Sequence, residues 1–260
     1  MQLNGDRVMR KKILPIIFFL SVFLWPQPVD AIRATNVKIG KGEAIISYLA
    51  GAAQVMSMGT DVFQTLKIGD KLAAGAEVST GSKTKIELIM PDKSRLRFAD
   101  DSRFKLVQIE AGEAEPRSIK VHLALGKAWA NVSKAVGAES SFALTCENAI
   151  AGVRGTIYRL DVNEDKSALV KVYDGAVAVT GGGKALEPPQ LIGAPQKIAG
   201  PLPIVGPKPV SMEEWTFVVK AMQQIVIGGD GKPQKPQPFA EREDQDSWVE
   251  WNKAQDSKHD

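Results

Sequence analysis

The sequence predicts a mainly β protein with a short α-helical extension at its C-terminal end. The first observation is a period of two in the apolar residues between Ala44 and Thr180, which is the spacing of half-buried strands. The second is a series of turn signals between these runs, such as Pro91-Asp92-Lys93 and Asp174-Gly175. The third is that no amphipathic helical pattern interrupts the runs, which argues against a parallel sheet flanked by helices.

Residues 1–31 are predicted to be a secretory signal peptide. A basic cluster at Arg10–Lys12 precedes Ile13–Trp25, which contains no charged residue, and cleavage is expected after Ala31. The apolar run is shorter than the roughly 20 residues that span a bilayer, which favours cleavage over the alternative of an uncleaved membrane anchor. The protein is therefore expected to be periplasmic or secreted, with membrane contact only through this segment.

Charge and cysteine content narrow the possible partners. The 260-residue chain has 33 Lys and Arg against 30 Asp and Glu; four of the former and two of the latter lie in residues 1–31, which leaves 29 against 28. No nucleic acid partner is expected, because such binding needs a clustered basic face. The single cysteine, Cys146, has no partner for an internal disulfide, so it is expected to pack as a small buried residue or to form an intermolecular disulfide.

Several short runs between Ala44 and Thr180 show the alternation clearly. They are Ile86–Met90, Leu96–Phe98, Phe104–Leu106 and Val170–Val172. In the run 157–162, Tyr158, Leu160 and Val162 are predicted to face one way, and Ile157, Arg159 and Asp161 the other. Trp129 is the one large aromatic residue of the run 126–132, and it is expected to fill the core or a sheet edge; a sugar-stacking platform is the alternative.

The composition changes after Thr180. Residues 187–210 contain seven prolines, which lack the amide donor that a sheet or helix needs, so an extended connector lying against the β-domain is predicted.

Residues 211–260 are predicted to form a helical C-terminal tail. The capping box Ser211–Glu214 begins a first helix, apolar residues at helical spacing from Trp215 to Val226 continue it, and Gly228-Gly229 ends it. Trp248 and Trp251 lie one helical turn apart. Two such rings are expected to dock onto a core, and the alternative is that they bind a partner.

The sequence contains no motif that predicts catalysis or a cofactor. His122, His259 and Cys146 lack the neighbours of a nucleophile–base pair. Zinc spacing, the calcium loop pattern and the phosphate loop are absent from the sequence. A non-enzyme with no catalytic, cofactor-binding or metal-binding residues is therefore expected. A carbohydrate-active envelope enzyme is the least favoured alternative, because it would need only two carboxylates.

The turn around Arg154 poses the question of what an arginine does between two glycines. Gly152 and Gly155 allow backbone angles that other residues avoid. The guanidinium of Arg154 has five donors that can satisfy several carbonyls at once. We expect it to act as a clamp that ties the turn to an adjacent strand layer with unpaired carbonyls; a receptor for an anion or carboxylate is the alternative.

The segment AIAGVRGTIYRLDV, followed by LVKVYDGAVAV, resembles the core of the FecR domain, the periplasmic sensing module of iron-citrate-type signal transducers. The earlier segment LKIGDKLAAGAEVSTGSKTKIELIMPDKSRLRF is similar to its first half, so the resemblance covers about residues 42–181. It implies a β-solenoid-like, twisted two-layer β-domain, no enzymatic activity, and contact with other envelope proteins. The motif residues are Gly152, Arg154, Gly155, Thr156, Asp174 and Gly175.

The chain departs from full FecR-type transducers at its N-terminal end. Those proteins carry a cytoplasmic anti-sigma region before a membrane helix, whereas at most twelve residues precede the apolar run at Ile13. The resemblance is therefore to the stand-alone exported type. We expect a non-catalytic binding, scaffold or sensing module whose partner is an envelope protein or a glycan such as peptidoglycan. Trp248 and Trp251 are the candidate partner-binding residues, and a membrane-anchored transducer is the alternative.

Overall fold

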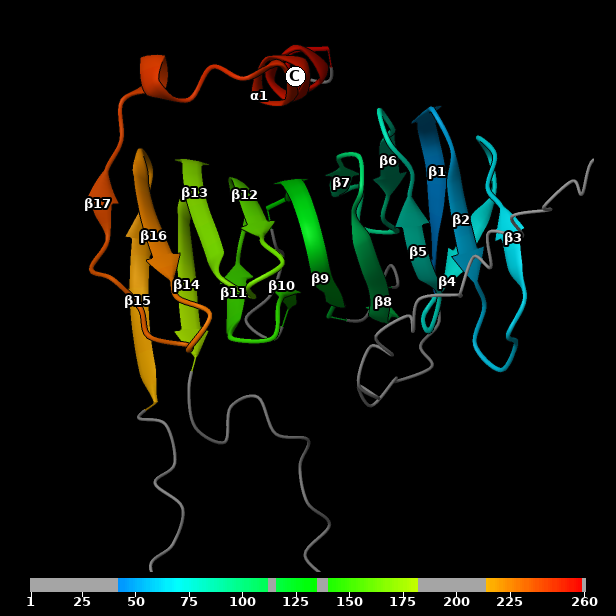
Figure 1. Ribbon diagram of the computed structural model, residues 1–260, viewed down its shortest axis with the longest axis horizontal. Coiled ribbons are helices and arrows are strands. Elements are labelled where there is room, and N and C mark those ends of the chain that lie inside the picture. The colour runs from blue at the N-terminus through cyan, green and yellow to red at the C-terminus, as the bar shows by residue number, and fades with distance from the viewer. Residues whose placement is uncertain (1–41, 112–115, 135–139, 182–213, 259–260) are drawn as a thin grey trace, which may run out of the picture. The chain divides into compact units, whose positions relative to one another are not determined.

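A computed structural model describes residues 42–111, 116–134, 140–181 and 214–258 (Figure 1). The expected signal segment, residues 1–31, and the proline-rich connector, residues 187–210, lie outside them. The described chain is mainly β with one short α-helix near its C-terminal end, as the sequence predicts. No helix within these ranges is long and apolar enough to cross a membrane.

The strands form two open sheets, A and B, which share strand β9. Sheet A has the order β4-β1-β6-β7-β9-β12-β13-β16-β17. Its strands are β1 (Glu43–Ala50), β4 (Lys71–Ala73), β6 (Lys85–Ile89), β7 (Arg95–Phe98), β9 (Ser118–Asn131), β12 (Ile157–Val162), β13 (Ala168–Asp174), β16 (Gln223–Ile227) and β17 (Gln237–Pro238).

Sheet B has the order β3-β2-β5-β8-β9-β10-β11-β14-β15. Its further strands are β2 (Ala53–Met56), β3 (Phe63–Thr65), β5 (Glu77–Thr80), β8 (Arg103–Glu110), β10 (Ser141–Thr145), β11 (Ala149–Val153), β14 (Ala176–Gly181) and β15 (Trp215–Lys220). The chain then forms the one-turn 3₁₀ helix η2 (Glu241–Glu243) and the helix α1 (Ser247–Asp256).

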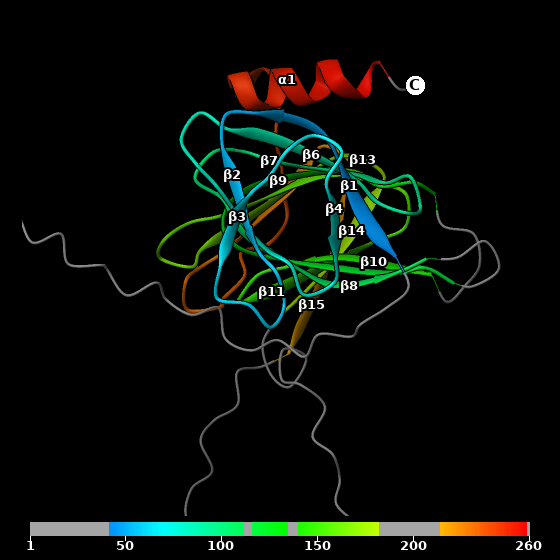
Figure 2. The same ribbon diagram turned by 90° about the vertical axis from the view of Figure 1, so that its right-hand side faces the viewer.

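The hydrophobic core lies between the two sheets, which Figure 2 shows as two layers. Phe98 of sheet A stacks on Phe104 of sheet B with ring centroids 3.6 Å apart, and both side chains are fully buried. Tyr158, Leu160 and Val162 of β12 all belong to this core, which confirms the predicted alternation. The opposite side chains of the same strands therefore lie on the outer face of sheet A.

Strand β9 joins the two sheets. Residues Ser118–Leu125 pair with strands of sheet B, and residues Gly126–Asn131 pair with strands of sheet A. Gly126 has φ +99° where the strand changes sheets. A Cβ atom there would lie 2.7 Å from the Cα of Ser102, so the position requires glycine.

The first predicted tail helix is wrong, because Trp215–Lys220 forms strand β15 and Gln223–Ile227 forms strand β16; residues 211–213 at its predicted start lie outside the described ranges. Val219 is fully buried and Val218 is 57 % exposed, which is the period of a strand. The segment is rich in β-branched residues, which fit a pleated, half-buried surface. Strand β15 pairs with β14 and β16 pairs with β13, so pairing with existing sheets decides the structure. The second predicted helix is confirmed by α1.

Candidate functional site

The FecR-like motif residues lie at two corners where the chain passes between the sheets. Arg154–Thr156 connects β11 of sheet B to β12 of sheet A, and Gly175 follows β13 and leads back into β14 of sheet B. Gly155 and Gly175 both have positive φ, +76° and +81°. Thr156 Oγ1 donates to the carbonyl of Ala176 at 3.0 Å, which ties the two corners together.

Close contact at these corners explains the glycines. A Cβ atom on Gly175 would lie 2.9 Å from the carbonyl oxygen of Gly155, and one on Gly155 would lie 2.8 Å from Lys134 Cγ. Gly152 lies within β11, where a Cβ atom would meet only ordinary contacts. Arg154 is exposed, and Asp174 is exposed at the end of β13. The roles of Arg154 as clamp or anion receptor both stay predictions.

Two residues that could carry nucleophilic chemistry, Cys146 and His122, lie on opposite faces of sheet B. Cys146 is buried in the core, and this burial raises the pKa of its thiol. His122 alternates with core residues of β9, so it lies on the outer face of sheet B, with Nδ1 3.1 Å from Thr145 Oγ1. Burial lowers the pKa of His122. Within the described ranges, no group of three or more His, Cys, Asp or Glu residues is placed to hold a metal ion.

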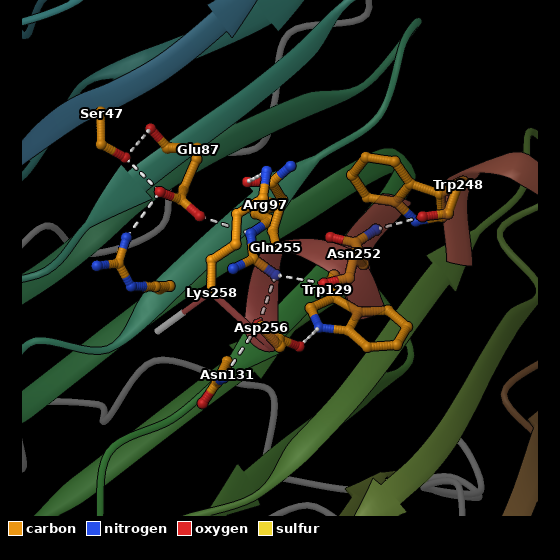
Figure 3. Close-up of polar contacts among 11 residues, drawn as sticks. Ser47, Glu87, Arg97, Trp129, Asn131, Trp248, Asn252, Gln255, Asp256 and Lys258 are labelled. Atoms are coloured by element: carbon orange, nitrogen blue, oxygen red, sulfur yellow. Dashed lines mark hydrogen bonds and ion pairs between the residues drawn. The ribbon is translucent and has the colours of Figure 1, made fainter. Parts of the chain in front are cut away.

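Helix α1 lies over one layer of strands (Figure 2), and a layer of buried charges lies between it and the outer face of sheet A. Arg97 of β7 is fully buried at the centre of this layer. Its Nε donates to Glu87 Oε2 at 2.6 Å, and its Nη1 donates to Asp256 Oδ1 at 2.7 Å and to the Asn252 carbonyl at 3.2 Å (Figure 3). Arg97 therefore links strand β6 to helix α1.

Asp256 accepts hydrogen bonds from three residues of the sheet. Besides Arg97, Asn131 Nδ2 donates to its Oδ1 at 3.0 Å, and Trp129 Nε1 donates to its Oδ2 at 2.9 Å (Figure 3). Trp129 is 1 % exposed and stacks on Tyr173 with centroids 4.4 Å apart. It therefore packs beneath α1, neither in the core between the sheets nor on an open surface.

Glu87 extends this network to strand β1. Its Oε1 accepts a hydrogen bond from Ser47 Oγ at 2.6 Å (Figure 3) and another from Arg95 Nη1 at 2.8 Å. Burial alone would raise the pKa of Glu87, but these hydrogen bonds and the charges of Arg97 and Arg95 outweigh it and lower the pKa. The carboxylate is therefore ionised at neutral pH.

A second group of charges surrounds Asp244, which follows η2. Lys171 Nζ donates to its Oδ1 at 2.8 Å, and the Tyr173 hydroxyl donates to its Oδ2 at 2.5 Å. Arg159 Nη1 lies 3.1 Å from Oδ1 without hydrogen-bond alignment, so this contact is an attraction between charges. Burial opposes ionisation, but these partners lower the pKa of Asp244.

Asp161 lies on the same face, with Oδ2 3.2 Å from Arg159 Nε. Burial raises the pKa of Asp161 to about 6, because the attraction of Arg159 and Lys127 does not offset it and Asp244 and Asp246 repel it. Asp246 lies 3.7 Å from Arg159 and also caps α1 by accepting from Val249 N at 2.8 Å.

Trp248 and Trp251 both contact sheet A through their rings. Trp248 is 5 % exposed, packs with Ala99 and Trp129, and stacks on Trp251 at 5.4 Å. Trp251 lies 5.3 Å from Tyr48 of β1. This is the arrangement that docking onto the sheet requires; a role in binding a partner stays a prediction.

Sequence reasoning missed Arg97, Asp244 and Asp256 as members of one layer. Two signals were present. Charged residues alternate with core residues on three outward-facing runs, at Arg95 and Arg97, at Arg159 and Asp161, and at Lys171. The tail from Glu241 is rich in acids. Opposite charges on a sheet face and on a tail indicate that the two meet.

The fold and its glycine corners define an open, two-sheet β-domain whose chain passes repeatedly between its layers. Residues 76–178 match the protein-family model described as FecR protein, which is the family that the sequence resembles. A comparison with curated proteins finds no match.

Among solved structures, the chain is similar to a "putative anti-sigma factor" from Parabacteroides distasonis ATCC 8503, which is represented by crystal structures at 1.65 Å and 2.50 Å resolution. For each, the sequence identity is 15 %, the TM-score is 0.42, and the match covers 62 % of this chain and 59 % of that chain. This chain therefore spans less than two thirds of that protein, and a likeness at this level carries no argument about function.

Proposed function

We propose that the chain is a non-catalytic, exported FecR-domain protein that acts as a binding, scaffold or sensing module in the cell envelope. The match of residues 76–178 to the FecR family is the observation that carries this proposal. The positions of the motif residues support it, because Gly155, Thr156 and Gly175 build corners between sheets. The buried charges also support it, because they pair with one another across α1.

The proposed envelope location rests on the signal-peptide pattern of residues 1–31, and the proposed partner is an envelope protein or a glycan. Cell fractionation tests the location: the protein is expected outside the cytoplasmic fraction. Recovery in the cytoplasm would contradict the export part of the proposal.

Site-specific photo-crosslinking in intact cells tests the binding part. A photo-reactive residue is placed at Val62 or Val218, which are 65 % and 57 % exposed. Val62 immediately precedes edge strand β3 of sheet B, and Val218 lies in β15 at the other edge of that sheet. A discrete adduct with an envelope protein or a glycan is expected from at least one exposed position. Phe104, which is fully buried, is the matched control and should give none. A panel of exposed positions on both sheets that gives no adduct would contradict the proposal.

The second candidate is a membrane-anchored FecR-type signal transducer. The same FecR match favours it, together with the uncharged run Ile13–Trp25, if that run stays attached. N-terminal sequencing of the protein isolated from cells separates the two candidates. A start at Ile32 supports the exported module, and an intact N-terminal segment in the membrane fraction supports the transducer.

A further inference from the structure

We propose that the outer face of sheet A is a docking surface for an acidic, tryptophan-bearing helical segment of a partner protein, and that this chain's own C-terminal strap covers it in a releasable way. The C-terminal strap is residues Glu241–Asp256, which comprise η2 and α1. The inference rests on the proposed binding function and names the surface and the chemistry of the partner.

Charge complementarity identifies the kind of partner. The sheet face beneath and beside the strap carries six bases and two acids, which are Lys85, Arg95, Arg97, Lys127, Arg159, Lys171, Glu87 and Asp161. Three carboxylates of the strap, those of Asp244, Asp246 and Asp256, form ion pairs with these bases. Without the strap, this face has six bases against two acids, an excess of four positive charges, which attracts an acidic segment and repels a basic one.

Aromatic side chains supply a second element of recognition. Trp248 fills a site beside Trp129 and Ala99, and Trp251 lies between Tyr48 and the ammonium of Lys85, whose Nζ is 5.0 Å from the ring centroid. Tryptophan is the residue type that most often dominates binding energy at interfaces. The partner segment that fits this face is therefore a short helix with acidic residues at both ends and tryptophans between them.

The strap is separable from the rest of the fold because its apolar contacts form their own cluster. Ala99, Trp129, Trp248 and Val249 constitute that cluster, and none of them belongs to the core between the sheets. Release of the strap therefore leaves the main core covered. A region whose apolar contacts are separate from the main core can open without unfolding that core.

Two properties make release easier than a fully packed helix would allow. Within the described part of the chain, Trp248 Nε1 and Asn252 Oδ1 are buried without a protein hydrogen-bond partner, which reduces the net stability of the contact. Helix α1 has ten residues, and helices this short are marginal in water when isolated. The strap therefore loses its helix when it leaves the sheet. A partner's segment competes for the sheet face with a short strap that is held weakly.

The test uses the full chain and a strap-weakened variant, Asp244→Asn with Asp256→Asn. The matched control is Glu241→Gln with Glu250→Gln, which removes the same charge from exposed positions of the strap. Hydrogen exchange measures strap release. Fluorescence anisotropy measures binding of a labelled synthetic peptide with the sequence of residues 240–258, which serves as the acidic, tryptophan-bearing probe.

In the strap-weakened variant, strap amides are expected to exchange at least tenfold faster, and the peptide to bind at least tenfold more tightly, than in the unmodified and control proteins. A peptide with asparagine in place of Asp244, Asp246 and Asp256, the aspartates that pair with bases of the sheet, should bind at least tenfold more weakly than the original. Binding should also weaken with added salt, because the attraction is between charges.

Three results would overturn the inference. They are faster strap exchange without peptide binding, unchanged strap exchange, and loss of protection throughout both sheets, which would make the strap an integral part of the fold. None of these results contradicts the proposed function, because photo-crosslinking at Val62 and Val218 tests binding near the two edges of sheet B independently. An adduct there with no peptide binding would retain the proposed function and reject this inference.

Discussion

Side chains are fully buried in two regions of the domain, the core between the sheets and the charged layer beneath the strap. The free energy that offsets their burial comes from different interactions in the two regions. Phe98 in the core and Arg97 in the layer are adjacent residues of β7, and both are 0 % exposed. Burial of Phe98 is favourable by itself, because apolar surface leaves water. Burial of Arg97 is costly by itself and is offset by Glu87, Asp256 and the Asn252 carbonyl.

This difference shows that complete burial does not indicate how strongly a region is held. The core side chains act together, so the core opens when the whole domain unfolds. The layer includes a few charge pairs whose strength changes with pH. The strap is therefore the part of the domain that conditions or a competitor can move.

The largest effect is expected from Phe98→Ala. The substitution removes a ring that stacks on Phe104 at 3.6 Å, and it should lower the free energy of unfolding by about 4 kcal/mol. Urea unfolding followed by circular dichroism measures the loss. Amides of the sheets and of the strap should lose protection together; loss confined to the strap would break the distinction between the two regions.

Arg97→Met is expected to have the next largest effect, about 3 kcal/mol, because it leaves Glu87 and Asp256 buried without their shared cation. Faster hydrogen exchange should be confined to the strap and strand β6. Adding Glu87→Gln and Asp256→Asn should recover much of the loss, since the unpaired charges are then absent. A loss as global as that of Phe98→Ala would contradict the separation of the layer from the core.

Gly155→Ala is expected to cost about 2 kcal/mol, because the position has φ +76° and a Cβ atom would lie 3.0 Å from Lys134 Cα. Gly155 lies at a corner between the two sheets and not beneath the strap, so the melting temperature should fall without selective release of the strap. Gly152→Ala is the matched control and should be nearly neutral, since its nearest neighbour is the Ala178 carbonyl at 3.9 Å. Equal losses for both variants would contradict the assigned role of the corner.

The pH dependence of strap attachment should have a maximum between about pH 4 and pH 6. The pKa of Asp161 is raised to about 6, so its stabilising contribution is complete below about pH 4 and is lost as the pH rises through 6. The pKa values of Glu87 and Asp244 are lowered, so their contributions are present above about pH 4 and are lost as the pH falls further.

Asp161→Asn sharpens this expectation. The variant should hold the strap more firmly than the unmodified protein at pH 8, by about 1 kcal/mol, and equally at pH 4. The gain is less than the full pKa shift implies, because Arg159 also loses an ion-pair partner. Strap hydrogen exchange, corrected for the intrinsic pH dependence, gives the measurement, and an unchanged pH profile would contradict the assignment to Asp161.

Arg154→Ala is expected to have the smallest effect, about 0.5 kcal/mol, because Arg154 is exposed. A small fall in melting temperature fits the predicted clamp. Unchanged melting together with loss of an adduct in the crosslinking experiment would instead favour the receptor interpretation.

The sequence predicted the core well, because local alternation decides which side of a strand faces inward. Tyr158 and Leu160 are buried in the core, and Arg159 between them lies on the outer face, as expected. The spacing of Trp215, Val218 and Val219 suits a helix as well as a strand, and only pairing with β14 decides between them. The charged layer was beyond local patterns, because Arg97 and Asp256 are separated by 159 positions.

Strand β9 gives this domain a mechanical property. One continuous backbone hydrogen-bonds to neighbours in sheet B through Ser118–Leu125 and to neighbours in sheet A through Gly126–Asn131. A shear force applied to one layer is therefore transmitted along covalent bonds into the other. Trp129 and Asn131 lie at the sheet A end of β9, and both donate hydrogen bonds to Asp256. Tension applied to sheet B is therefore transmitted to the residues that hold helix α1.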